Sequence, residues 1–214
     1  HPLPDVTGLQ KLLSGFGIGP ESRVVVYDEG GGAMAARLWW LLRWLGHAQV
    51  GLLDGGYGAW CTAGLPVSTV PPARRNGSFV ARPGCMPVVT TCDVEASLGT
   101  EQMLLLDLRA RERYLGRVEP IDPVAGHVPG AVSAPFSAHL GADGRFLPAA
   151  ELRRHFSGLL GARPVGDVGC MCGSGVTACH GILALELAGW PGAALYVGSW
   201  SEWIRAAERP VARE

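Results

Sequence analysis

The chain contains 214 residues, of which 48% are hydrophobic and 17% are charged, and its formal net charge at pH 7 is −1. This composition supplies an ample apolar core, and the length suits two small domains. The near-neutral charge argues against a general nucleic-acid partner or an acidic-surface partner, and no apolar stretch approaches the roughly 20 residues that a membrane-spanning helix needs.

The first part of the sequence predicts alternating strands and helices. Residues 24–27 predict a strand, residues 33–45 a helix that stops at Gly46, and residues 50–53 a second strand, after which Trp60 lies in a short helix. This alternation predicts a parallel sheet covered by helices on both faces. The tryptophans of the first helix follow helical spacing and are expected to pack in the core.

Residues 68–87 predict a linker. They contain a Pro-Pro pair, two arginines followed by Asn-Gly, and a Pro-Gly dipeptide, all of which mark turns and loops. We therefore expect a first domain at residues 1–67, this linker at residues 68–87, and a second domain at residues 88–214.

The second domain repeats the order of elements of the first. The corresponding features are a strand at residues 165–171, a helix at 176–188, a stop at Gly189, a strand at 194–197 and Trp203. The offset between the copies is 144 residues from Asp28 to Cys172 and 143 from Gly46 to Gly189. Asp28 of the first copy therefore stands where the second copy has Cys172.

The second domain also has elements that the first lacks. A strand is predicted at residues 103–106, with Asp107 and Arg109 at its end expected to form a structural ion pair, and a turn containing His127 follows at residues 126–131. We expect His127 to be a turn residue rather than a catalytic base. Because the first copy has no such strand and turn, either the sequence is a fragment of a longer protein or the first domain is unusually small. We favour the fragment and expect the first domain to be truncated at its N-terminus.

The most informative segment is Cys172 with the small-residue loop that follows it, because an apolar strand delivers a thiol to the start of a helix. A helix start has unpaired N–H groups and a positive dipole end, which favour an anion. The thiolate is the reactive form of cysteine. The alternative, a buried structural cysteine, is common, but the small and donor residues around Cys172 argue against it.

The loop residues each suit this chemistry. Gly173 and Gly175 allow close approach and unusual backbone conformations, and Ser174 and Thr177 can supply hydroxyl donors. The N–H groups of the loop, including that of Val176, are expected to stabilise a terminal sulfur anion as an oxyanion hole stabilises oxygen. Asp28 cannot carry sulfur, and we interpret it as a helix N-cap residue or a loop acid.

Two other kinds of site fit this region less well. The potential metal ligands are Cys170, Cys172, Cys179 and His180. Cys179 and His180 are adjacent on a helix and point about 100° apart, which does not suit tetrahedral zinc. A cysteine phosphatase would carry arginine where this chain has Ala178, and without it bidentate phosphate recognition is lost. We expect no metal and no organic cofactor.

These motifs together resemble the rhodanese-type sulfurtransferases, and the Cys172 loop is most similar to the 3-mercaptopyruvate sulfurtransferase branch. The residues that carry the resemblance, besides the loop, are Asp-Glu-Gly-Gly-Gly at 28–32, Arg-Leu-Trp-Trp at 37–40, Leu-Asp-Gly-Gly at 53–56, Gly-His-Val-Pro-Gly-Ala at 126–131 and Gly-Ser-Trp-Ser-Glu-Trp at 198–203. The resemblance implies an α/β fold of two rhodanese-like domains, the first inactive and the second catalytic.

The resemblance also implies roles for residues beside Cys172. Arg113 matches the arginine that binds the anionic donor, and Ser174 matches a serine that relays a proton together with a histidine, whose place is taken by His1. The mercaptopyruvate enzymes carry a second arginine where this chain has Asp122, for which Arg117 is a possible substitute. Preference between mercaptopyruvate and thiosulfate is therefore open.

The implied reaction moves sulfane sulfur from a small anionic donor to an acceptor through a Cys172 persulfide. The expected acceptors are thioredoxin, another small thiol, or cyanide, and neither nucleic acid nor a membrane is expected as a partner. A rhodanese-like binding or regulatory module without turnover is the alternative, and the intact loop favours the enzyme. The six cysteines lack the short-loop spacing of secreted disulfide-rich domains, so we expect reduced thiols in a cytoplasmic protein.

Overall fold

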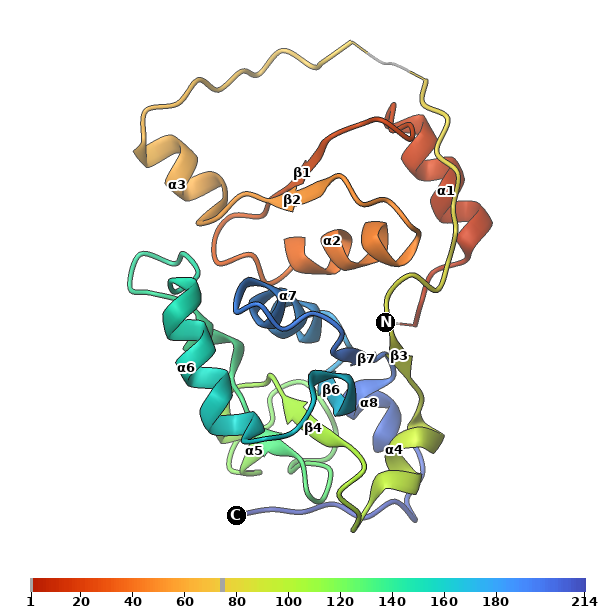
Figure 1. Ribbon diagram of the computed structural model, residues 1–214, viewed down its shortest axis with the longest axis vertical. Coiled ribbons are helices and arrows are strands. Elements are labelled where there is room, and N and C mark those ends of the chain that lie inside the picture. The colour runs from red at the N-terminus through yellow and green to blue at the C-terminus, as the bar shows by residue number, and fades with distance from the viewer. Residues whose placement is uncertain (1, 74–75) are drawn as a thin grey trace.

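The computed structural model describes residues 2–73 and 76–214, which form two halves that meet where helices α2 and α7 pack against each other (Figure 1). His1 and the arginine pair of the linker, residues 74–75, lie outside the described residues. Each half holds its own sheet, and the pairs of named strands are parallel. The predicted fold class, parallel sheets flanked by helices, is confirmed.

The first half is built around a two-stranded sheet. Its elements in chain order are α1 (Val6–Gly15), β1 (Val24–Val26), α2 (Ala35–Trp44), β2 (Val50–Leu52) and α3 (Gly56–Thr62). Trp39, Trp40 and Trp44 of α2 are buried in the core, as their spacing predicted. The aromatic face of α2 therefore holds the first half together.

The second half holds a five-stranded sheet in the order β3-β7-β6-β4-β5. Its elements are β3 (Val88–Val89), α4 (Thr91–Ser97), β4 (Leu104–Asp107), α5 (Arg111–Tyr114), β5 (Val132–Ser133), α6 (Ala149–Leu160), β6 (Val168–Met171), α7 (Ala178–Leu187), β7 (Ala194–Tyr196) and α8 (Ser199–Trp203), with short 3₁₀ turns at Phe136–His139 and Val165–Asp167. The middle strand is β6, so the residue after it, Cys172, emerges at the carboxyl edge of the sheet, where ligands bind in such folds.

Both faces of this sheet are covered. Leu106 and Cys170 face the core shared with α2, α6 and α7, whereas Leu105 and Met171 face the core that contains the tryptophans of α8. A parallel sheet buried on both faces needs apolar side chains in both directions. Among the described residues, no helix has the length and apolar character required to cross a membrane.

Three elements begin two or three residues later than predicted, and one of them is the helix predicted at residues 33–45, which begins at Ala35. The strand predicted at residues 165–171 begins at Val168, because Val165–Asp167 forms a 3₁₀ turn closed by a hydrogen bond from the Asp167 N–H to the Pro164 carbonyl at 3.0 Å. The helix predicted at residues 176–188 begins at Ala178. Gly175 has φ +76°, a conformation that a right-handed helix does not contain.

Part of the predicted linker packs on the first half. Phe79 is buried, and its N–H donates to Ser14 Oγ of α1 at 3.1 Å, while the Arg82 N–H donates to the Leu45 carbonyl at 2.9 Å. Figure 1 shows this segment, drawn in yellow, passing α1 before it reaches β3. The division of the chain at residues 1–67, 68–87 and 88–214 stays a prediction.

Candidate active site

Cys172 is anchored by the first residues of α8. Its N–H donates to Ser199 Oγ at 3.2 Å, and its carbonyl accepts a hydrogen bond from the Trp200 N–H at 3.0 Å. Its side chain is 2% exposed and lines a cavity of about 530 Å³. The thiol therefore lies at the end of β6, is almost fully buried, and faces the cavity.

Ser199 was missed by the sequence analysis. It has φ +51° and is the one non-glycine residue with a positive φ in the described part of the chain. Its hydroxyl donates to the Tyr196 carbonyl at 2.8 Å while accepting from Cys172. Such a conformation costs on the order of 1 kcal/mol and persists where surrounding contacts determine it. The internal repeat could have indicated this backbone conformation, because Ser199 aligns with Gly56, which has φ +63°.

The cavity is formed by residues of both halves. Its lining residues are Met34, Arg113, Ile121, Asp122, Cys172, Gly173, Ser174, Val176, Thr177 and Ser201. Gly175 lies behind them, and a Cβ at this position would come within 2.6 Å of the Val197 carbonyl oxygen. Only glycine fits there. The structure thus brings Arg113 and Ser174 to Cys172, while their roles stay predictions.

The backbone donors of the loop are available for a ligand. In the part of the chain that the structure describes, no acceptor is hydrogen-bonded to the N–H groups of residues 173–178. These groups precede α7, whose dipole adds positive potential at the same place. The loop therefore suits an anionic group attached to Cys172 Sγ.

The corresponding loop of the first half shows how such donors are used. Both carboxylate oxygens of Asp28 accept hydrogen bonds from backbone N–H groups, which belong to Gly30, Gly32, Met34 and Ala35 at 3.0–3.1 Å. The interpretation of Asp28 as a loop acid is confirmed. The first copy closes its loop around its own carboxylate, whereas the second copy presents a thiol.

Two further cysteines lie near Cys172 but are deeply buried. Burial raises the pKa of the Cys170 thiol well above its usual range, and the neighbouring sulfurs of Cys179 and Cys172 add to this effect. Burial also raises the pKa of Cys179 to about 12, although the Arg37 guanidinium opposes the shift. Both residues therefore stay protonated at neutral pH and are poor nucleophiles.

Arg113 lies on α5 against the active-site loop and is bound to two carboxylates. Its Nε and Nη2 atoms reach Glu119 Oε1 at 2.9 and 2.7 Å, and Nη2 also reaches Asp122 Oδ2 at 2.9 Å. An added Cβ on Gly173 would lie 3.6 Å from both Nη atoms of Arg113. Among the described residues, Arg113 Nη1 has no hydrogen-bond partner, so this atom can bind a donor molecule.

The pKa values of the two carboxylates are shifted in opposite directions. Burial would raise the pKa of Glu119, but hydrogen bonds from Arg113 and from the N–H groups of Asp122 and Ile121 outweigh it and lower that pKa. The pKa of Asp122 is raised, first by burial and then by the negative charge of Glu119, despite Arg113. Glu119, which the sequence analysis missed, is thus the firm counterion of Arg113.

The other described residues named in the sequence analysis do not line the cavity. Arg109 and Asp107 form the expected buried ion pair, with Nη2 and Oδ2 2.6 Å apart. His127 is buried and stacks on Tyr114 with ring centroids 3.8 Å apart. Trp200 and Trp203 of α8 are buried and belong to the core. Arg117 is exposed and is not part of the cavity lining.

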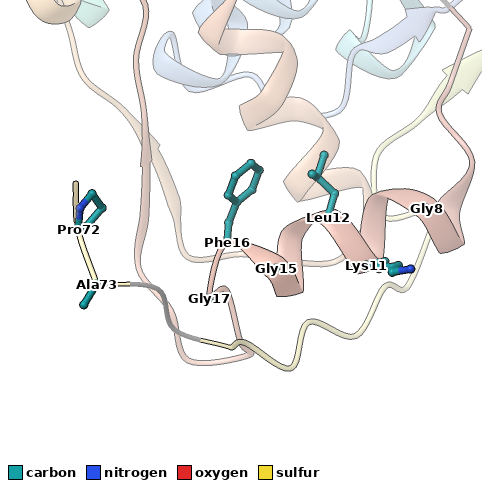
Figure 2. A pocket seen from close by; sticks show the side chains of 8 residues that line it. All are labelled: Gly8, Lys11, Leu12, Gly15, Phe16, Gly17, Pro72 and Ala73. Carbon is teal, nitrogen blue, oxygen red and sulfur yellow. The ribbon is translucent and has the colours of Figure 1, made fainter.

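A larger hollow lies far from this chemistry. It has a volume of about 720 Å³ and is formed by α1 and the residues before the end of the first described range, as Figure 2 shows with Leu12, Phe16 and Pro72. Among the residues that the structure describes, its lining contains one charged residue, Lys11, and neither a cysteine nor an acid. We therefore choose the Cys172 cavity as the candidate active site because of the residues that line it, although it is the smaller of the two.

A cysteine that a central parallel strand delivers into a loop of unpaired N–H donors defines an enzyme that holds an anionic group on sulfur. Comparison with known proteins agrees. The rhodanese-like domain family matches residues 1–63 and 90–206 of the chain. The chain therefore belongs to the rhodanese family of sulfurtransferases, as its motifs predicted.

Individual relatives match along almost the whole chain. A probable 3-mercaptopyruvate sulfurtransferase of Pseudomonas aeruginosa is 52% identical over 213 residues, covering 99% of this chain and 75% of the relative. A putative thiosulfate sulfurtransferase, SseB of Mycobacterium tuberculosis, is 40% identical over 214 residues, covering 100% of this chain and 75% of the relative. Among solved structures, 3-mercaptopyruvate sulfurtransferase from Leishmania major is 30% identical with a TM-score of 0.81, covering 95% of this chain and 57% of that one.

Proposed function

We propose that the protein transfers sulfane sulfur from a small anionic donor to a nucleophilic acceptor through a persulfide on Cys172. The observation that carries this proposal is the loop of residues 173–178, whose N–H groups have no acceptor among the described residues. The Asp28 loop supports it, because equivalent backbone donors there bind a carboxylate.

The first step loads the enzyme. With 3-mercaptopyruvate, the Cys172 thiolate attacks the donor sulfur, the carbon–sulfur bond breaks, and its electron pair stays on carbon as the enolate of pyruvate. A proton must then reach that carbon, and we propose that Ser174, which lines the cavity, relays it. With thiosulfate, the thiolate attacks the sulfane sulfur, the sulfur–sulfur bond breaks, and sulfite leaves with the electron pair and needs no proton.

The second step discharges the enzyme. A thiolate acceptor attacks the outer sulfur of the persulfide, the bond to Cys172 Sγ breaks, and the Cys172 thiolate is restored. Cyanide would accept the same atom as thiocyanate. We propose thioredoxin or another small thiol as the natural class of acceptor, because a thiol acceptor needs only a second sulfur-centred displacement.

The charges around the donor site favour mercaptopyruvate over thiosulfate. Arg113 brings one positive charge to the cavity, but it is paired with two negative charges, those of Asp122 in the cavity lining and of Glu119. Mercaptopyruvate presents a single carboxylate that Arg113 Nη1 can bind, whereas thiosulfate and its sulfite product are dianions. The relative at 52% identity also carries the name of a probable 3-mercaptopyruvate sulfurtransferase.

All six cysteines are described and free, three of them exposed. Exposed thiols persist in reducing compartments, and this supports a cytoplasmic location.

The proposed function is tested by comparing kcat/KM for 3-mercaptopyruvate and thiosulfate with a small thiol as acceptor. A preference for thiosulfate of roughly tenfold or more, about 1.4 kcal/mol in transition-state binding, would reject mercaptopyruvate as the donor.

A further inference from the structure

The two halves contact each other through the equivalent helices of the repeat. Helix α2 (Ala35–Trp44) and helix α7 (Ala178–Leu187) are related by an offset of 143 residues and pack against each other. Figure 1 shows α7 lying directly against α2, between the two sheets. Each helix begins just after the loop that contains Asp28 or Cys172, so the two loops lie near this interface.

A side chain of each helix binds the loop of the opposite half. Arg37 Nη1, on the third residue of α2, donates to the Gly175 carbonyl at 3.1 Å. His180 Nε2, on the third residue of α7, bonds with the Gly31 carbonyl at 3.0 Å and must be the donor, because a carbonyl only accepts.

The two accepting glycines are equivalent as well. Gly31 is the third residue after Asp28, and Gly175 is the third residue after Cys172. Both have a positive φ, +74° and +76°. The contact is therefore reciprocal, and the loop of the first half, whose N–H groups bind the Asp28 carboxylate, can be compared directly with the loop of the second half.

In the first half, this contact orients a peptide that binds an anion. All peptide bonds in the described chain are trans, so the C=O and N–H of one peptide point in opposite directions. His180 holds the Gly31 carbonyl, and the N–H of the same peptide, on Gly32, donates to Asp28 Oδ1 at 3.1 Å. The equivalent peptide in the second half joins Gly175 to Val176.

We propose that Arg37 is a positioning residue that orients the Gly175–Val176 peptide so that the Val176 N–H faces the outer sulfur of the Cys172 persulfide. This inference rests on the proposed function. The guanidinium is charged, so it polarises the peptide more strongly than a neutral donor does. The Cys179 thiol also donates to the Gly175 carbonyl, at 3.4 Å, and reinforces the same orientation. In this way Arg37 of the first half orients a peptide of the Cys172 loop in the second half.

The test compares two arginines of the same helix. Arg37→Met removes the donor but keeps an unbranched side chain beside Trp40, whose ring centroid lies 5.6 Å from the guanidinium carbon. Arg43→Met is the matched control. Arg43 lies over Trp39 and is 3.9 Å from Glu186 of α7, and within the described part of the chain it forms no hydrogen bond or ion pair with the Cys172 loop. Arg37→Lys restores a charged donor.

The measurements are the rate of Cys172 persulfide formation, kcat, KM for the donor, and Tm. We expect Arg37→Met to lower the loading rate and kcat by about 10- to 100-fold, with KM within about threefold of the unsubstituted protein, because removal of one donor to a developing anion has effects of this order or larger. Arg43→Met should lower Tm similarly but keep both rates, and Arg37→Lys should recover part of the loss.

Equal loading rates in Arg37→Met and Arg43→Met would overturn the inference, as would a change in KM alone. An unsubstituted protein that forms no persulfide on Cys172 would overturn the proposed function together with this inference. An unsubstituted protein that loads normally and an Arg37→Met variant that does the same would overturn the positioning role alone.

Discussion

Arg113→Gln separates the binding role of this residue from its structural role. The substitution removes the one cation among the described residues that line the cavity, and it leaves Glu119, whose side chain is 4% exposed, without its main counterion. Loss of a charge-assisted contact to the donor costs about 1.5–3 kcal/mol, which corresponds to a fall in kcat/KM of about 10- to 100-fold.

The same change should also lower the free energy of unfolding. Glu119 would keep its bonds from the N–H groups of Ile121 and Asp122, at 3.2 and 3.1 Å, and its contact with Arg109 at 3.4 Å. Because these partners compensate only part of the burial, we expect a loss of about 1–3 kcal/mol. The double variant Arg113→Gln/Glu119→Gln removes the unpaired charge and should recover most of this stability.

Urea unfolding and steady-state kinetics with 3-mercaptopyruvate on the unsubstituted, single and double variants form the assay. We expect stability to return in the double variant while kcat/KM stays low. Recovery of kcat/KM together with stability would refute donor binding by Arg113 and leave it only as the counterion of Glu119. An unchanged kcat/KM in the single variant would refute it too.

Three further changes test the surroundings of the site. Asp122→Asn removes a negative charge from the cavity and should lower KM for thiosulfate more than for mercaptopyruvate; equal changes would contradict the charge argument. Ser174→Ala should lower kcat with mercaptopyruvate about 10- to 100-fold but leave thiosulfate nearly unaffected, since sulfite needs no proton, and equal losses with both donors would exclude a proton relay. Burial lowers the pKa of His139 to about 3, and His180 and His155 add to the shift. At this residue the unfolded chain therefore binds a proton below about pH 6.5 that the folded chain does not, so His139 alone lowers stability by about 1.4 kcal/mol per pH unit as the pH drops from 6.5 towards 3. His139→Phe should flatten this fall between pH 6.5 and 5 in urea unfolding, and an unchanged slope would contradict the assignment.

The sequence predicted the fold well because the periodicity of its apolar residues reports burial directly. The tryptophans of α2 and the central strand β6 lie where their patterns placed them. The start of α7 was predicted too early, because the positive φ of Gly175 is set by its close contact with the Val197 carbonyl, which is distant in sequence. Local propensity does not contain such a contact.

The candidate site was predictable only in part. The loop that follows Cys172 is contiguous, so its chemistry could be read from adjacent residues. Glu119, Ser199 and Arg37 contribute through contacts across turns, helices and the interface between the halves. Their roles depend on tertiary geometry, although the internal repeat pairs Ser199 with Gly56 and α2 with α7.

The most direct test of the central claim is to locate the transferred sulfur. Purified protein is incubated with 3-mercaptopyruvate or thiosulfate without an acceptor, weighed by intact mass spectrometry and mapped by peptide analysis, beside Cys172→Ser. We predict that the unsubstituted protein gains the mass of one sulfur atom on Cys172. The Cys172→Ser variant should fold but should gain no mass. Sulfur found on Cys170 or Cys179 instead, or no gain with either donor, would contradict the account.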